Sequence, residues 1–160
     1  MGVIHDAVHL EEKAERIYRE AANHTHDHGA TLLLGLLADA EAGHAAVLRD
    51  FSGVENLKGP DLVAAASAWV RGAVEGGAKA LSPDSQLVDI LRRAMDLEHE
   101  TETFYLHHAE KATDVRVAQL LGELAKIERS HYALVSSLVE YYNRPNEWVE
   151  SAEFGLRPGY

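Results

Sequence analysis

Two short motifs in this 160-residue chain combine a carboxylate with an imidazole at the same spacing. They are Glu41-Ala-Gly-His44 and Glu128-Arg-Ser-His131. Residues three positions apart lie on one face of an α-helix, so each motif directs an oxygen donor and a nitrogen donor the same way. Oxygen and nitrogen donors without sulfur suit iron or manganese, and less often zinc. Each motif therefore predicts part of a metal site.

The offset of 87 residues that separates the two motifs also relates other residues of the same types. Glu98 lies 87 residues after Glu11, and Tyr105 lies 87 residues after Tyr18. The interval from the lone glutamate to the motif glutamate is then the same in both halves of the chain. We infer an internal two-fold repeat in which each half supplies a lone glutamate, a tyrosine and a Glu-x-x-His motif.

Six side chains of the repeat could meet at one level of a helical bundle. Four carboxylates buried together cannot all stay ionised, because desolvation and mutual repulsion cost several kcal/mol per charge. Either they take up protons, or two divalent cations balance the four negative charges, and we predict such a dinuclear site. Glu41 and Glu128 are placed to bridge the ions, the lone glutamates to cap the ends, and each histidine to bind one ion. The predicted ligands are Glu11, Glu41, His44, Glu98, Glu128 and His131.

Tyr18 and Tyr105 each lie two helical turns after a lone glutamate and so share its helix face. Their hydroxyls could hydrogen-bond to carboxylates of the facing helices and orient them, which would give both tyrosines a part in the chemistry. The alternative is that both rings pack in the core with satisfied hydroxyls.

The spacing of prolines and glycines divides the chain into helices. Proline breaks helices, and the stretches free of it predict four long ones, at about 3–26, 30–52, 84–111 and 115–143. We expect a polar turn that ends in a C-cap at Gly29, an N-cap at Thr113 or Asp114, and a helix start at Ser82-Pro83-Asp84. A shorter helix within 61–71, ended by Gly76-Gly77, would lie in the long connection between the second and third helices.

This pattern predicts an all-α fold, an antiparallel four-helix bundle with a long crossover between helices two and three. Residues 1–144 would form the bundle. Residues 145–160 would form a short C-terminal tail with three aromatic residues, packed on the bundle or on a partner subunit.

Composition limits the function further. The net charge of −11 argues against binding to nucleic acid or to an anionic membrane. The absence of cysteine excludes thiol catalysis and iron–sulfur clusters within these residues. Neither a secretory signal nor an 18-residue apolar run is evident, so we expect a cytoplasmic protein without a membrane span.

A glutamate on each of two helices and Glu-x-x-His on the other two is the ferritin-like di-iron arrangement. Over about residues 3–143 the chain resembles the rubrerythrin family. The residues that carry the resemblance are Glu11 with Tyr18, Glu41-x-x-His44, Glu98 with Phe104-Tyr105, and Glu128-x-x-His131. The resemblance implies a cytoplasmic protein with two iron ions that reduces hydrogen peroxide, or oxygen, by cycling between diferrous and diferric states. Manganese or a mixed metal pair would use the same ligands.

Two departures from the family pattern bear on activity. Typical rubrerythrins carry a further carboxylate three residues after the third-helix glutamate, where this chain has Thr101; nearby Glu102, or its repeat mate Glu15, could substitute. Typical rubrerythrins also append a rubredoxin domain with paired cysteines. Since this chain has no cysteine, the electrons would come from a separate donor protein.

Three functions remain open on the sequence. The first is the peroxidase, which we expect to be a homodimer. The second is a ferroxidase or iron-handling protein, and the third is a metal-free structural bundle. The other histidines are not expected to bind metal in the bundle core. We expect His5 and His9 at the surface or in a subunit contact, and His24, His26 and His28 in a solvated loop. His107 and His108 are adjacent and point in different directions, so at least one of them should be solvated.

Overall fold

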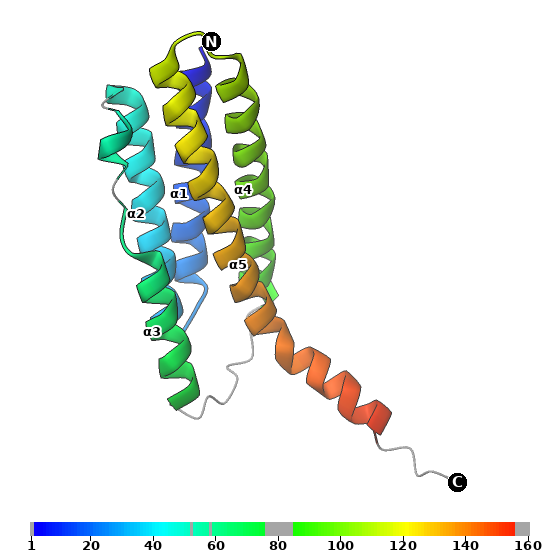
Figure 1. Cartoon of the computed structure of the whole chain (residues 1–160). Coiled ribbons are helices and arrows are strands. Elements are labelled where there is room, and N and C mark those ends of the chain that lie inside the picture. The colour runs from blue at the N-terminus through cyan, green and yellow to red at the C-terminus, as the bar shows by residue number, and fades with distance from the viewer. Residues whose placement is uncertain (1, 52, 58, 76–84, 156–160) are drawn as a thin grey trace.

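Four long helices make up most of the chain in the computed structural model, which describes residues 2–51, 53–57, 59–75 and 85–155. The helices are α1 (Val3–Asn23), α2 (His28–Asp50), α4 (Ser85–Lys111) and α5 (Val115–Gly155), and they pack side by side as a bundle (Figure 1). Within the described residues there is no strand. The predicted all-α bundle is confirmed.

Two hydrophobic clusters divide the core along the bundle. One contains Tyr18, Leu37, Leu91 and Val135, and the other contains Ala7, Leu48, Tyr105 and Leu124. From its N-terminus, α1 passes from the second cluster to the first, and α5 does the same, whereas α2 and α4 run the opposite way. Each consecutive pair, α1 with α2 and α4 with α5, is therefore an antiparallel hairpin, as predicted.

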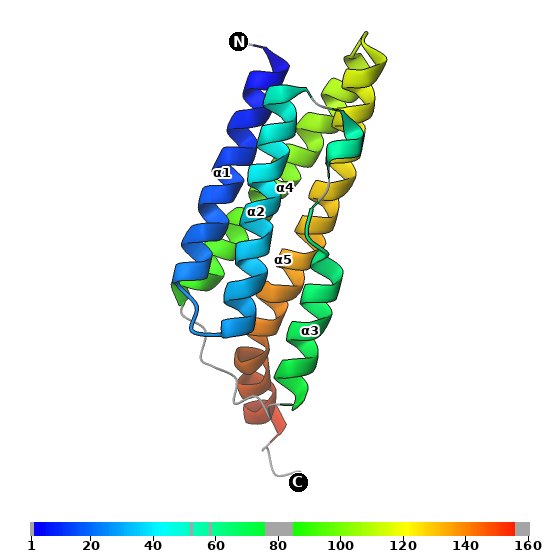
Figure 2. The ribbon, with the colours of Figure 1, turned by 90° about the vertical axis from the view of Figure 1, so that its left-hand side faces the viewer.

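The parallel course of α2 and α4 explains the long crossover. Helix α2 ends beside the second cluster, where Phe51, Val54 and Leu57 pack, but α4 must begin beside the first. A 3₁₀ helix, η1 (Val54–Asn56), and then α3 (Leu62–Glu75) occupy the connection. Helix α3 lies along the outside of the bundle beside α2 and α5 (Figure 2), where Leu62 and Trp69 pack on the first cluster. The predicted Gly76-Gly77 stop and the predicted Ser82-Pro83-Asp84 start lie outside the described residues.

The turn between α1 and α2 differs from the prediction. Helix α1 is capped at His24, and Gly29 lies in the first turn of α2, whose N-cap is Asp27. The Asp27 carboxylate accepts hydrogen bonds from the backbone N–H groups of Gly29 and Ala30, and its second oxygen accepts one from the indole of Trp69. Because an aspartate satisfies the free amides at a helix start, the glycine belongs to the helix that follows it rather than to the one before. In the second hairpin, Asp114 caps α5 through the backbone N–H of Arg116, as predicted.

Helix α5 continues twelve residues beyond the predicted end at 143 and runs through Pro145 to Gly155. Proline removes one backbone donor and crowds the preceding turn, which a bent helix can accommodate. Figure 1 shows the C-terminal part of α5 turning away from the bundle. The proposed boundary at 144 stays a prediction, and residues 156–160 lie outside the described part of the chain.

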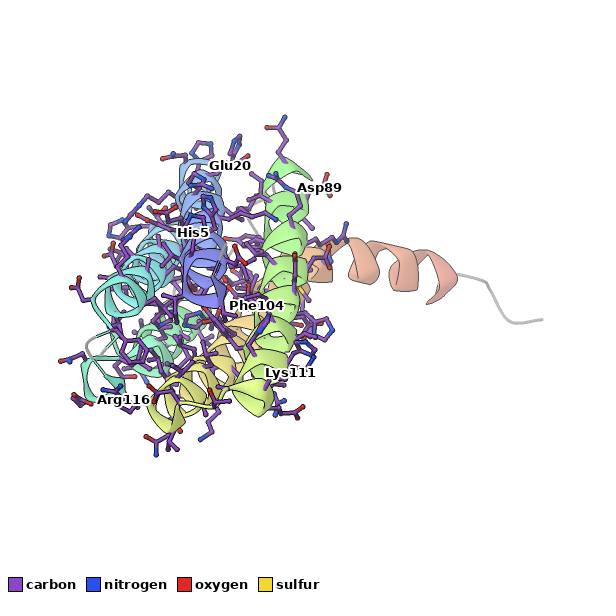
Figure 3. The ribbon with its side chains drawn as sticks, turned by 90° about the horizontal axis from the view of Figure 1, so that it is seen from above. His5, Glu20, Asp89, Phe104, Lys111 and Arg116 are labelled. Atoms are coloured by element: carbon purple, nitrogen blue, oxygen red, sulfur yellow. The ribbon has the colours of Figure 1, made fainter. Side chains whose placement is uncertain are left out.

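Helix α2 is apolar enough, over an 18-residue window of mean hydropathy 1.4, to pass for a membrane span by length and composition. Most of that window is buried against the other helices, and it includes Glu41 and His44. Burial in the bundle core therefore accounts for its hydropathy. Seen along the bundle axis, the charged side chains of Glu20, Asp89 and Lys111 lie on the outside (Figure 3).

Candidate metal centre

A cluster of ionisable side chains lies between the two hydrophobic clusters, at the middle of all four long helices. Each member is at most 5% exposed. The members are Glu11 of α1, Glu41 and His44 of α2, Glu98 of α4, and Glu128 and His131 of α5. The structure thus brings all six predicted ligands together.

The six side chains form two overlapping groups whose donor atoms all lie within 4.8 Å of one another. One group is Glu11, Glu41, His44 and Glu128, and the other is Glu41, Glu98, Glu128 and His131. Glu41 and Glu128 belong to both groups, while each lone glutamate and each histidine belongs to one. Two cations held by these groups would share the two common carboxylates, as the sequence predicts for bridging ligands.

The polar atoms of the cluster lie close together, but several of them have no hydrogen-bond partner. Nδ1 of His44 lies 3.3 Å from Glu11 Oε2 and 3.2 Å from Glu41 Oε2. Nδ1 of His131 lies 2.7 Å from Glu41 Oε1, yet neither atom has a hydrogen-bond partner. Glu98 Oε2 and Glu128 Oε1 are also buried without a partner. Lone-pair atoms this close repel unless a proton or a cation lies between them, so the donor set fits divalent metal ions.

Burial and like charges hold the cluster partly protonated in the absence of metal. Desolvation, with repulsion from Glu98 and Glu11, raises the pKa of Glu41 well above its ordinary value. Desolvation and repulsion from Glu41 and Glu11 raise the pKa of Glu128 in the same way. Desolvation opposes ionisation of Glu11 as well, but its hydrogen bond and attraction to His44 prevail and lower its pKa.

The pKa values of the two histidines shift in opposite directions, although the residues occupy equivalent places in the repeat. Burial lowers the pKa of His44, but its hydrogen bonds and attraction to Glu11 and Glu41 outweigh burial and raise the pKa to about 9. His131 lacks such hydrogen bonds, and desolvation lowers its pKa. In the metal-free protein His44 is therefore charged at neutral pH, whereas His131 is neutral with a lone pair free for a metal ion.

Both predicted tyrosines reach the cluster from its two ends. The hydroxyl of Tyr18 on α1 donates to Glu98 on α4, and that of Tyr105 on α4 donates to Glu11 on α1. Desolvation and the nearby carboxylates raise the pKa of both phenols, so both remain protonated donors. The predicted contacts with carboxylates of the facing helix are present, and a part in catalysis stays a prediction.

The two extra glutamates of the repeat do not join the cluster. Glu15 pairs with Arg19, with oxygen and nitrogen 2.9 Å apart, and Glu102 accepts a 2.7 Å hydrogen bond from Arg129. Their one-residue displacement from the ligand positions turns them toward the surface. Thr101 is instead buried on the face of α4 that carries Glu98. Its position was visible in the sequence, but no sequence signal showed that its hydroxyl would be left without a partner.

Comparisons with known proteins agree with this arrangement. The rubrerythrin family model matches residues 3–139. A solved structure, of a hypothetical protein from Pyrococcus furiosus, superposes with a TM-score of 0.63 at 19% identity and covers 89% of each chain. At that identity the likeness shows the fold alone. A search of curated proteins gave no match.

Proposed function

The chain belongs to the rubrerythrin family, and we propose on that basis that it is a non-haem di-iron oxidoreductase that reduces hydrogen peroxide, or oxygen. The family, and a buried cluster able to hold metal, support a di-iron protein. The observation that carries the proposal is the sharing of Glu41 and Glu128 between two ligand groups. Shared carboxylates would hold two ions close enough to act on one small substrate.

Each protein group has a distinct part in this proposal. Glu41 and Glu128 would bridge the ions, Glu11 and Glu98 would cap them, and His44 and His131 would each bind one ion. When bound, the iron pair supplies the two electrons that break the O–O bond. Tyr18 and Tyr105 would hold the two capping carboxylates by their hydrogen bonds and fix which oxygen faces the metal. The hydrophobic clusters on both sides would limit the access of water.

The reaction requires electrons from outside the cluster. Reduction of one hydrogen peroxide to two waters consumes two electrons and two protons. Because these 160 residues contain no cysteine, we propose a separate protein as the donor. We further propose that the protein is a cytoplasmic homodimer. Its net charge of −11 supports the proposal that it binds neither nucleic acid nor anionic membranes.

A stopped-flow experiment tests the activity. The protein is loaded with ferrous iron without oxygen, two ions per chain are verified by elemental analysis, and hydrogen peroxide is added. We expect rapid oxidation of the iron pair, followed by repeated turnover when a chemical reductant is supplied. An unchanged spectrum after peroxide would overturn the proposal.

The alternative is a ferroxidase, in which ferrous iron is a substrate rather than a resident cofactor. The same four carboxylates and two histidines could serve it. Two results together would favour this alternative. The protein would consume excess ferrous iron and release ferric product, and it would not reduce peroxide repeatedly when a reductant is supplied. A large hollow assembly in size-exclusion chromatography would point the same way, and a dimer would favour the peroxidase.

A further inference from the structure

Five buried side-chain atoms among the described residues have no hydrogen-bond partner. Four belong to the six predicted ligands. The fifth is the hydroxyl of Thr101, a residue only 2% exposed. A buried hydroxyl without a partner costs free energy, so its retention calls for a ligand that the protein itself does not provide.

The position of Thr101 along α4 places it at the wall of the cluster. It lies three residues after Glu98 and four before Tyr105, both of which reach the cluster with their side chains. All three residues fall within about 60° around the helix axis. The Thr101 side chain therefore occupies the same inward face, between the Glu98 carboxylate and the hydrogen bond from Tyr105 to Glu11.

Other helical hydroxyls of this protein behave differently. Thr103, Ser130 and Ser137 each donate to the backbone carbonyl four residues earlier, the usual way for a helix to satisfy such a group. Thr101 makes no such bond although it is buried. Its hydroxyl is thus left available to the interior of the cluster.

The internal repeat is broken at this position. The repeat mate of Thr101 is Ala14, which is also buried, on the face of α1 that carries Glu11 and Tyr18. One half of the repeat therefore has a methyl group where the other half has a hydroxyl. The cluster consequently has one hydrogen-bonding side chain in its wall that is neither a predicted ligand nor bonded to one.

We propose that Thr101 is a positioning residue that hydrogen-bonds a small ligand with an oxygen or nitrogen lone pair, such as water, hydroxide, peroxide or azide, when that ligand enters the metal-loaded cluster. The inference rests on the proposed function, because it needs metal ions in the cluster. Charge balance supports it: four carboxylates neutralise two divalent ions, so oxidation to the ferric state leaves positive charge that attracts an anion. The Thr101 hydroxyl would donate to that anion and select where it lies.

Azide titration of the ferric protein tests this inference. Thr101→Val keeps the shape and removes the hydroxyl, and Thr101→Ser keeps the hydroxyl. We expect the valine variant to hold the full metal content and bind azide about tenfold more weakly, since one hydrogen bond is lost. The serine variant should retain most of the affinity. The matched control is Thr103→Val, an exposed change two residues away that should leave azide affinity unchanged.

A second readout uses the metal-free protein and separates ligand binding from structure. Because the hydroxyl has no protein partner, Thr101→Val should unfold in urea at the same midpoint as the parent or a higher one. A lower midpoint would assign the hydroxyl a structural part and overturn the inference, as would equal azide affinity in the metal-loaded parent and valine variant. Failure of the parent to bind metal would instead overturn the proposed function, and this inference with it.

Discussion

The ionisation of the cluster depends on burial and on which charged groups neighbour each member. Desolvation by burial, followed by repulsion from the remaining glutamates, raises the pKa values of Glu41 and Glu128, which belong to both ligand groups. Glu11 is stabilised as an anion by His44. The residues best placed to bridge two cations are thus the ones whose protonated forms the metal-free protein favours, which couples metal binding to proton release.

This coupling predicts that metal binding releases protons. His44, whose pKa is about 9, carries a proton at pH 7 in the metal-free cluster, and the raised pKa values of Glu41 and Glu128 favour their protonated forms. Metal ligation requires these groups without their protons, so loading at pH 7 should release at least the proton of His44. Because protons compete with metal, apparent affinity should rise with pH up to about 9. Isothermal calorimetry in buffers of different ionisation enthalpy measures the number, and release of no protons would contradict the assignment.

The same argument separates bridging from capping ligands. Glu41→Gln removes one donor from both ligand groups, whereas Glu11→Gln removes one from a single group. We expect Glu41→Gln to weaken the binding of both ions and Glu11→Gln to weaken the binding of one ion strongly. The loss of affinity in Glu41→Gln should exceed the roughly 10–100-fold that follows when a ligand loses its outer hydrogen-bond partner. Elemental analysis after dialysis against limiting metal gives the stoichiometry. Equal metal content in the two variants would contradict the bridging role.

At the scale of elements, a few contacts hold the crossover against the bundle. Asp27 caps α2 and also accepts the indole hydrogen bond of Trp69 from α3. The Trp69 ring lies so close to Gly29 that a Cβ there would be 2.3 Å from its Cδ1. The first turn of α2 therefore serves both as a helix start and as the docking site of α3.

This packing predicts opposite effects of alanine at two glycines of the same helix. Gly35→Ala meets no atom within 4 Å and should stabilise the protein by up to about 1 kcal/mol through helix propensity. Gly29→Ala must displace Trp69 and should destabilise it by about 1–3 kcal/mol. Urea unfolding of the two variants provides the comparison. An equal gain in both would show that α3 does not pack closely there.

The sequence predicted the elements well where a local signal decides them. The two Glu-x-x-His motifs, the repeat and the proline spacing led to four helices with all six cluster residues on inward faces. The sequence misled at Gly29, because glycine suits both a helix end and a close approach; the Asp27 cap places it in the helix that follows, where it contacts Trp69, 40 residues away. The continuation of α5 through Pro145 was also missed, since a bend can accommodate what local propensity forbids.

Over the whole molecule, the polar cluster interrupts a core that is otherwise hydrophobic at both ends. The flanking clusters, with Leu37 and Leu91 on one side and Leu48 and Leu124 on the other, give the bundle its stability. The buried carboxyls oppose that stability when no cation is present. The bundle is consequently a scaffold whose free energy of unfolding should depend on metal.

Removing the metal should lower the melting temperature, and more so at higher pH. In the metal-free protein the raised pKa values of Glu41 and Glu128 give a contribution to stability that is present below their ordinary pKa of 4.5 and is lost as pH rises. The contribution of His44 is present below 6.5 and is lost as pH rises through about 9, which acts in the same direction. The lowered pKa of His131 acts the other way, but only as pH rises toward 6.5. In the metal-loaded protein, stability should instead rise with pH, because deprotonated ligands bind the metal ions more tightly.

The size of the effect follows from mass action. Two bound ions, each with a free concentration of about 100 times its dissociation constant, would add about 5 kcal/mol to the free energy of unfolding. For a domain of this length that corresponds to a melting temperature about 10–20 °C higher at pH 7. Thermal unfolding followed by circular dichroism, with and without a chelator at pH 5, 7 and 9, measures it. The difference in melting temperature with and without chelator should increase with pH in the parent, and it should be smaller in Glu41→Gln than in the parent. A melting temperature that does not change with chelator at any of these pH values would exclude a metal-binding core.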